Sequence, residues 1–97
     1  MIKVVAKNVV AAERIAEFKA AVVELVAETR KESGCISYQL FQDVKDPRVL
    51  SFIEEWQDRE ALAKHMQSPH FLKVVPQLDR MKVPDAASEV NVYDLVI

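Results

Sequence analysis

The chain has 97 residues, of which 51% are hydrophobic and 29% charged, and it contains a single glycine. This composition is typical of one folded domain, and it excludes a disordered or low-complexity chain and a glycine-rich phosphate cradle. Because the net charge is −2 and the basic residues are scattered, no basic surface is available for nucleic acid or for an anionic membrane. We therefore expect a single domain over residues 1–97 with neither of these partners.

The cysteine and hydropathy patterns indicate a cytoplasmic protein. Cys35 is the only cysteine, which excludes an internal disulfide and a Cys-x-x-Cys metal site, and we expect this thiol to pack in the core. The first residues lack the unbroken apolar core of a signal peptide. No apolar run approaches the roughly 20 residues that span a bilayer. A soluble protein in the reducing cytoplasm is therefore the expectation.

The first third of the chain predicts a strand followed by a long helix. Residues 2–10 are rich in valine and alternate, with apolar side chains on both faces. Over residues 11–31 the apolar positions recur with a helical period, which predicts an amphipathic helix that covers a sheet. Its expected apolar stripe consists of Ile15, Phe18, Val22, Leu25 and Thr29. Gly34 lies just after the predicted helix, at a position that often has a left-handed backbone conformation. We therefore expect Gly34 to cap this helix.

A hairpin follows the helix. Residues 35–43 and 49–56 alternate, and Asp46-Pro47 between them predicts a turn, so the two strands should pair antiparallel. Strict alternation in the first strand places Ile36, Tyr38 and Leu40 on one face.

The last third predicts two helices and a strand. Asp58 is a good N-cap for a short helix over residues 59–67, and Ser68-Pro69 is a second helix start with proline at the first helical position. Pro76 falls inside this second helix and predicts a kink or a further break there. Residues 89–97 alternate again and form the last predicted strand.

The order of these elements predicts an α+β fold. Strand, helix, strand, strand, broken helix and strand form the ferredoxin-like split βαβ arrangement, with helices on one face of an antiparallel four-stranded sheet. Because the strands carry apolar residues on both faces, the uncovered face would be an unusually large exposed apolar patch. We therefore expect a homodimer that forms through the sheet faces.

Several of these positions together match a known family. At Gly34-Cys35, Tyr38, Glu54-x-Trp56, Asp58, His65 and Ser68-Pro69-His70-Phe71 the sequence resembles the antibiotic biosynthesis monooxygenase (ABM) family of dimeric α+β barrel proteins, including its quinol monooxygenase type. The resemblance covers nearly the whole chain. Because this superfamily also includes haem-degrading enzymes and an isomerase, the likeness identifies the fold more firmly than the reaction.

The resemblance implies a pocket between the sheet and the helices. There a quinol, phenol or polyketide-like aromatic would react with dioxygen, the co-substrate, with no cofactor and no metal. In the haem-degrading branch a histidine ligates iron, and the matching position here is Val75. His65 and His70 are five residues apart and separated by a helix start, so we expect no shared metal site.

The candidate catalytic residues are His65 and Asn8. His65 lies at the edge of the apolar face of its helix, and the near-neutral pKa of a histidine suits general acid or base catalysis. Asn8 lies on an apolar strand face, and the resemblance implies that its amide donates to a substrate oxygen. The alternative for Asn8 is a hydrogen bond to backbone or water.

The candidate substrate-binding residues also have structural alternatives. Trp56 and Phe52 share a strand face and form either a pocket wall or ordinary core. Tyr38 could point its hydroxyl into the pocket or satisfy it at the sheet surface, and Glu54 could orient a partner or form a buried pair. His70 could contact substrate or order the start of its helix.

Two other functions remain open from the sequence. One is an isomerase or aldehyde-processing relative that uses His65 as acid or base without consuming dioxygen. The other is a non-catalytic small-molecule-binding dimer, which would be favoured if no cavity lay beside Asn8 and His65.

Overall fold

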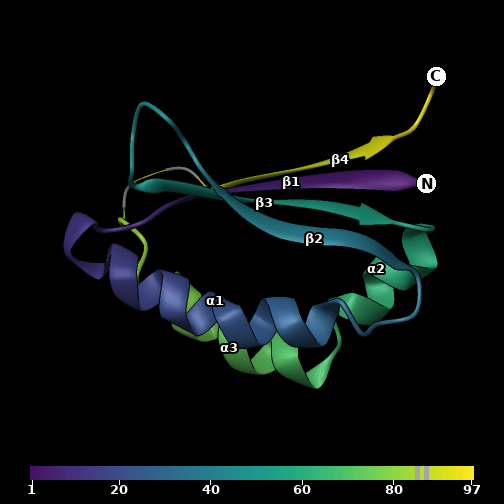
Figure 1. Ribbon diagram of the computed structural model, residues 1–97, viewed down its shortest axis with the longest axis horizontal. Helices are drawn as coiled ribbons and strands as arrows, with labels where there is room; N and C mark the ends of the chain where they lie inside the picture. Colours follow the sequence, from purple (N-terminus) through teal and green to yellow (C-terminus); the bar gives the residue numbers. More distant parts are fainter. Residues whose placement is uncertain (85, 87) are drawn as a thin grey trace.

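A four-stranded antiparallel sheet carries three α-helices on one face (Figure 1). The computed structural model describes residues 1–84, 86 and 88–97. Their elements are β1 (Ile2–Val9), a 3₁₀ turn (Ala12–Arg14), α1 (Ile15–Thr29), β2 (Cys35–Gln42), β3 (Val49–Trp56), α2 (Arg59–His65), α3 (Pro69–Asp79) and β4 (Glu89–Asp94). The strand order is β2-β3-β1-β4. This arrangement confirms the predicted ferredoxin-like α+β fold.

Strand β1 lies inside the sheet, between β3 and β4. Its residues Ile2, Val4 and Asn8 are buried on the helix-facing side, whereas Lys3 and Lys7 are exposed on the opposite side. The two-residue period of a strand explains this division. The predicted alternation of β1 is therefore confirmed, with its polar side chains concentrated on the uncovered face.

Helix α1 packs on the sheet through the predicted stripe, of which Phe18, Val22, Leu25 and Thr29 are buried. The helix is shorter than predicted, because a 3₁₀ turn precedes it and Thr29 ends it. Gly34 has the expected positive φ of 87°. However, it lies in the turn that leads into β2 and does not directly cap α1.

A β-bulge at the start of β2 changes the predicted alternation. Cys35 pairs with Trp56, and Ser37 pairs with Glu55, so the register shifts between them. A bulge inserts one extra residue and reverses the faces of the residues before it. Consequently Cys35 packs against the core, as expected, while Ile36 is 55% exposed and does not share the buried face of Tyr38.

Both predicted helix starts on the C-terminal side are confirmed. The Asp58 carboxylate accepts a hydrogen bond from the backbone N–H of Ala61, and the Ser68 hydroxyl accepts one from the N–H of Phe71. Of the kink or further break predicted at Pro76, the break is wrong, because α3 continues from Pro69 to Asp79. Pro76 lies on the exposed side of α3, where water can bond the carbonyl that loses its helical partner.

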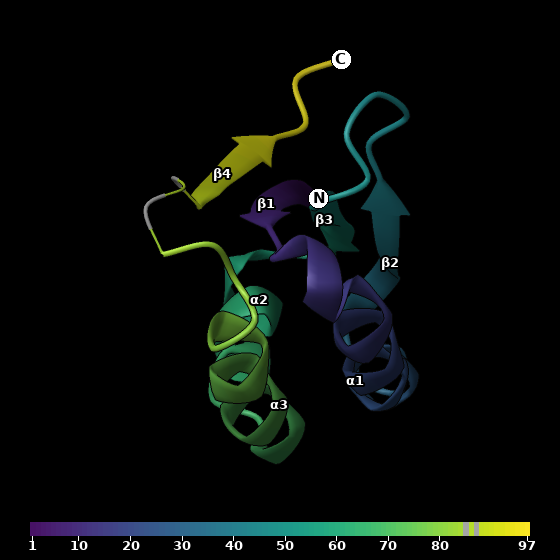
Figure 2. The same ribbon diagram turned by 90° about the vertical axis from the view of Figure 1, so that its left-hand side faces the viewer.

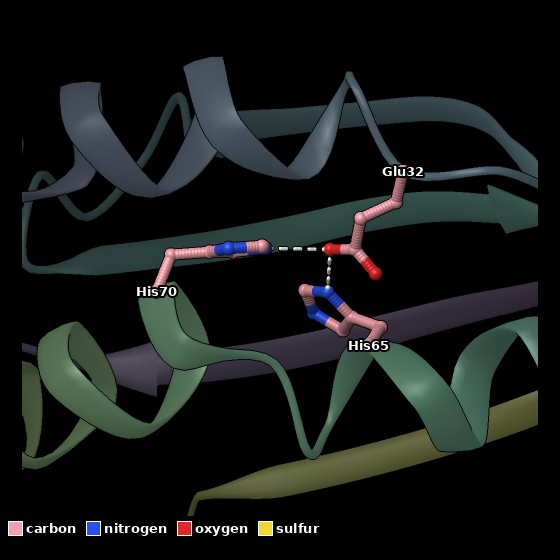
Figure 3. Close-up of side chains that lie close together, drawn as sticks. All are labelled: Glu32, His65 and His70. Atoms are coloured by element: carbon pink, nitrogen blue, oxygen red, sulfur yellow. Dashed lines mark hydrogen bonds and ion pairs between the residues drawn. The ribbon is translucent and has the colours of Figure 1, made fainter.

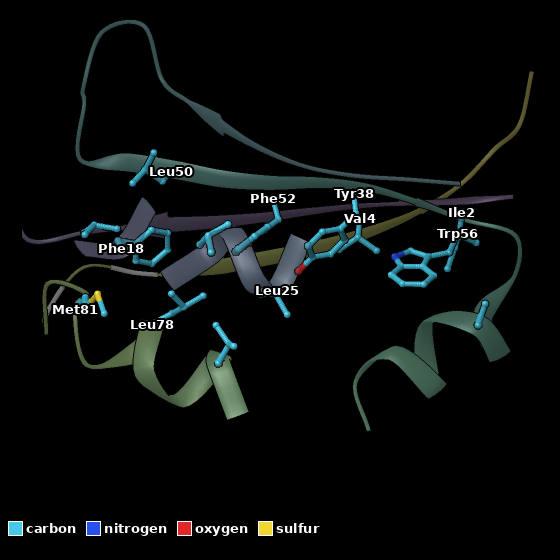
Figure 4. Close-up of a cluster of buried hydrophobic side chains, with 14 residues drawn as sticks. Ile2, Val4, Phe18, Leu25, Tyr38, Leu50, Phe52, Trp56, Leu78 and Met81 are labelled. Carbon is cyan, nitrogen blue, oxygen red and sulfur yellow. The ribbon is translucent and has the colours of Figure 1, made fainter. Parts of the chain in front are cut away.

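The core lies between the sheet and the helices. Figure 4 shows large side chains of the sheet, among them Phe52, Tyr38 and Trp56, lying in one layer that faces the helices. Figure 2 shows the helices below the sheet, while β4 lies at its far edge. All residues of β4 are exposed, and Val90 and Val92 remain uncovered on the helix-facing side. Among the described residues, no helix has the length and apolar character needed to span a bilayer.

Candidate active site

A cavity of about 220 Å³ lies between the sheet and the α2–α3 helices. Its lining is mainly apolar and includes Leu62, Met66, Phe71, Val75, Val90 and Val92. The polar residues that line it are Asn8, Tyr38, Glu54, His65 and Lys82. Four of the predicted site residues, one from each of β1, β2, β3 and α2, therefore meet in one cavity, and Phe52 lines it as well.

His65 is the last residue of α2 and is buried among aromatic side chains. Its ring centroid lies 4.7 Å from Trp56, 5.1 Å from Phe71 and 5.2 Å from Tyr38. Desolvation by this packing lowers the pKa of His65, although the nearby carboxylate of Glu32 opposes the shift. The imidazole is therefore neutral near pH 7.

The tautomer of His65 follows from its contact with Glu32. Nδ1 of His65 lies 2.8 Å from Oε2 of Glu32 (Figure 3). Since a carboxylate only accepts hydrogen bonds, Nδ1 carries the proton in this pair and Nε2 is the acceptor. Figure 3 shows the second ring nitrogen turned away from Glu32. Nε2 of His65 therefore makes no contact with Glu32 and is available as an acceptor on a residue that lines the cavity.

Glu32 also holds His70. Nε2 of His70 lies 2.7 Å from the same carboxylate oxygen, so Glu32 connects the turn after α1 to the end of α2 and the start of α3. The sequence reading missed Glu32, which lies in a turn and is 33 residues from His65 along the chain. The only signal in the sequence was that His65 and His70 each lacked an assigned hydrogen-bond partner.

The residues Glu32, His65 and His70 also have the ligand types of a metal site, and their three ligand atoms lie within 4.8 Å of one another. The two imidazoles lie on different helices and yet converge on Glu32, which their spacing in sequence did not indicate. Around zinc, with bonds of about 2.0–2.1 Å, tetrahedral ligand atoms lie roughly 3.3 Å apart. The observed contacts of 2.7 and 2.8 Å are hydrogen bonds that an ion would have to open. The absence of a metal stays a prediction.

Glu54 places a carboxyl group in the cavity. It is 5% exposed, and its Oε1 accepts a hydrogen bond of 2.9 Å from Nε1 of Trp56. Burial raises the pKa of Glu54 to about 7, and the charge of Glu32 acts in the same direction. Burial also raises the pKa of the neighbouring Tyr38 hydroxyl, which therefore stays a neutral donor.

Asn8 lines the cavity but uses its amide hydrogens elsewhere. Its Nδ2 donates to the backbone carbonyls of Leu50, at 3.1 Å, and of Ala6, at 3.2 Å. This is the backbone bonding considered as the alternative for Asn8. The group left for a ligand is the acceptor Oδ1, whereas the sequence reading expected a donor.

Two other predicted substrate contacts lie behind the cavity wall. Trp56 is fully buried and acts on the cavity through its bond to Glu54. His70 bonds Glu32 and is not among the lining residues.

Desolvation raises the pKa of the Cys35 thiol, so this residue has no activated thiolate.

Comparison with known proteins identifies the family. The family model described as antibiotic biosynthesis monooxygenase matches residues 1–77. The chain belongs to the ABM family. The description of this family is that of a monooxygenase.

Individual proteins are similar to the chain in sequence, and two of them are solved structures with the same fold. A crystal structure described as antibiotic biosynthesis monooxygenase is 38% identical, with a TM-score of 0.92 over 100% of both chains. A conserved protein from Methanosarcina mazei Go1 is 40% identical, with a TM-score of 0.90 over 95% of this chain and 89% of the other. The Synechocystis protein sll1783 is 32% identical over 93 residues, which are 95% of this chain. The matches cover only 55% to 62% of the length of the curated relatives.

Proposed function

We propose that the protein is a monooxygenase that oxidises a quinol or phenol of one or two rings with dioxygen and without a cofactor. The observation that carries this proposal is the apolar cavity of about 220 Å³ with Asn8, Tyr38, Glu54 and His65 in its wall. A purely structural core would not place four buried polar residues around an open space.

The size and lining of the cavity favour a small aromatic substrate. An apolar cavity of about 150 Å³ in another protein accommodates benzene. The larger space here suits one ring or two fused rings, and aromatic rings can pack against Phe52 and Phe71 in its wall. A polyketide of three or more rings would have to extend past the exposed strand β4. The smaller quinols and phenols are therefore the better candidates.

The electrons for this reaction come from the substrate. When a para-quinol becomes a hydroxyquinone, one atom of dioxygen enters the ring and the other leaves as water. The quinol loses four electrons, and dioxygen accepts all four. No external reductant is needed, and the protein contributes by orienting the substrate, excluding water and placing hydrogen bonds at the developing charge.

The polar residues have distinct positions for this role. The neutral Tyr38 hydroxyl can donate to a phenolate or a peroxy oxygen, and Oδ1 of Asn8 can accept from a second substrate hydroxyl. His65 presents an acceptor nitrogen, with Glu32 fixing the orientation of its ring. A buried histidine that acts as acid or base needs a partner that holds its ring and its tautomer. Glu32 is this partner for His65.

The test is oxygen uptake with a panel of benzoquinols, naphthoquinols and naphthols. We expect His65→Ala or Asn8→Ala to lower the rate at least tenfold, since acid–base groups contribute about 10²- to 10⁴-fold. Unchanged rates in both variants would reject these assignments. Turnover that continues at the same rate under nitrogen would instead support the isomerase alternative, and a rate lost with a chelator would contradict the absence of a metal.

A pair of adjacent residues supplies a matched control for the location of the site. Ala6 lines the cavity, and Val5 faces the opposite side of the sheet. Ala6→Phe should fill the cavity and abolish quinol binding, whereas Val5→Phe should leave binding unchanged in calorimetry. Equal effects of the two substitutions would place the substrate elsewhere.

We further propose a homodimer that forms through the uncovered sheet face. Val5 and Ile53 are cross-strand partners on this face, and Phe41 and Tyr93 are exposed beside them. Burying such a patch against a second copy would remove apolar area from water. Light scattering at micromolar concentration should give twice the chain mass, and Ile53→Glu should give a monomer. A wild-type monomer would contradict the proposal.

A further inference from the structure

Glu54 is a buried carboxyl group that has little structural purpose. Its side chain faces the helix layer from β3, and its cross-strand neighbours on that face are Val4 and Tyr38. Among the described residues, no lysine, arginine or histidine forms an ion pair with it, although seven ion pairs of lysine or arginine occur in that part of the chain. An unpaired charge in such a place destabilises the fold.

The single hydrogen bond that Glu54 makes does not require a carboxyl group. The indole N–H of Trp56 donates to Oε1, and a glutamine oxygen would accept this bond equally well. The bond fixes the side chain and occupies one oxygen, which leaves Oε2 for a ligand in the cavity that Glu54 lines. The arrangement therefore orients an acidic group toward the space where a substrate would lie.

The ionisable groups around Glu54 favour its action as a proton acceptor. Tyr38 from β2 is a neutral hydroxyl, His65 from α2 is a neutral imidazole, and the carboxylate of Glu32 lies beyond His65. β1 presents the apolar Val4 directly opposite Glu54, and Lys82, a cation that lines the same cavity, is paired with Asp79. Burial and the charge of Glu32 bring the pKa of Glu54 near neutrality, where a group can both take and return a proton.

We propose that Glu54 is the catalytic residue that takes the proton from the hydroxyl of a bound quinol or phenol. This inference rests on the proposed function and assigns the first chemical step, whereas His65 acts later or on another oxygen. The substrate class is an aromatic whose hydroxyl reaches Oε2 while its ring contacts the apolar wall, which excludes ethers and fully methylated quinols.

The step balances without any added reagent. The carboxylate removes a proton from the hydroxyl, so the products are a phenolate and a neutral carboxylic acid. The phenolate reduces dioxygen, and a bond forms between a ring carbon and oxygen to give a peroxy anion. Glu54 returns its proton to that anion. This return regenerates the carboxylate, and the hydroperoxide then loses water, formed from its terminal OH and the ring C–H hydrogen, which gives the ring carbonyl.

The first experiment compares Glu54→Gln with wild type using 1,4-naphthoquinol. We expect kcat to fall at least 100-fold, binding under nitrogen to stay within threefold, and the ionisation near neutrality to vanish from the pH profile of kcat/KM. Glu54→Asp should restore part of the rate together with that ionisation. A Glu54→Gln rate within threefold of wild type, or an unchanged pH profile, would overturn the proposal.

Glu55→Gln is the matched control. Glu55 is the next residue, it pairs with Ser37 on the opposite face of the sheet, and the Ser37 hydroxyl donates to its carboxylate at 2.9 Å. Its substitution removes the same charge outside the cavity and should leave kcat within twofold. A loss equal to that of Glu54→Gln would show that charge or folding, and not the cavity carboxyl, is responsible.

A second experiment does not depend on oxygen consumption. Under nitrogen at pH 8, binding of 4-nitro-1-naphthol, a phenol that is more acidic than Glu54, to the wild-type protein should produce the infrared carbonyl band of a protonated carboxylic acid, and this band should be absent when its methyl ether is used. The band supports the proton transfer even if no quinol consumes dioxygen, in which case only the proposed function fails. A bound naphthol without the band overturns the role of Glu54 even if oxygen is consumed.

Discussion

Oε2 of Glu32 lies 2.8 Å from Nδ1 of His65 and thereby fixes which ring nitrogen is available as an acceptor. The contact joins two segments that are separate in sequence and are both needed to place the imidazole beside the cavity. The role of Glu32 as a positioning residue is directly testable.

Glu32→Gln should lower kcat about 10- to 100-fold while changing KM less than threefold. The amide keeps the size of the side chain but removes the charge that holds the Nδ1–H tautomer of His65. Steady-state oxygen uptake measures both constants. Glu28→Gln is the control, since Glu28 is a half-buried residue that pairs with Lys31 and is not among the residues that line the cavity. A kcat that is unchanged in Glu32→Gln would mean that His65 acts without this carboxylate.

His70→Gln should lower the stability of the fold more clearly than the activity. Glutamine can still donate to Glu32, so we expect a loss of about 1 kcal/mol in the free energy of unfolding and less than a threefold loss in kcat. Urea unfolding and oxygen uptake give the two values. A large loss of kcat with unchanged stability would instead support the substrate contact that the sequence suggested for His70.

Glu54 should make the fold less stable as the pH rises. Its pKa is about 7 in the folded protein and 4.5 when unperturbed. The unfolded chain therefore releases the proton first, so the stabilisation is full below pH 4.5 and is lost as the pH rises to about 7. Between pH 5 and pH 8, the free energy of unfolding of Glu54→Gln should rise relative to wild type by up to about 3 kcal/mol.

His65 acts in the opposite direction, because its pKa is lowered in the folded protein and its contribution is lost as the pH falls below 6.5. The comparison between Glu54→Gln and wild type cancels this contribution, since both proteins contain His65. Parallel pH curves for the two proteins in urea unfolding would contradict the raised pKa of Glu54.

Gly34→Ala should destabilise the fold by about 2 kcal/mol or more. The residue has a φ of 87°, and an added Cβ would lie 2.6 Å from the Cβ of Ala61. Alanine is strained in this backbone region, and the contact would push α2 away from the turn. Thermal unfolding measures the effect, with Ser33→Ala at the exposed neighbouring position as the control. Equal melting temperatures for the two variants would show that the turn relaxes freely.

Local patterns were sufficient to predict the order of the elements and much of the cavity wall. The stripe of Phe18, Val22 and Leu25 is buried because a helix of period 3.6 can cover a sheet only with that face. Asn8 and His65 meet in one cavity, as expected, because each lies on the inner face of its own element. These predictions needed only the period of each segment and the usual layering of an α+β fold.

The remaining features depend on contacts between segments. The bulge that exposes Ile36 is set by pairing with β3, and no pattern within β2 indicates it. α3 accommodates Pro76 because this residue lies on the solvent side. Glu32 has no distinguishing neighbour in sequence, and its role appears only when the turn after α1 is brought to the two histidines.

The cavity divides its polar and apolar groups between two walls. Three of its polar residues, Asn8, Tyr38 and Glu54, come from the paired strands β1, β2 and β3, whose register holds them rigidly. The helices contribute mostly apolar residues, among them Leu62, Met66, Phe71 and Val75, together with the reacting group His65, and the edge strand β4 adds Val90 and Val92. Substrate range can therefore change through hydrophobic substitutions on the helix side without altering the reacting groups. For an engineer, the apolar residues of the helices are the place to diversify in a library, and His65 and the polar residues of the sheet are the part to hold constant.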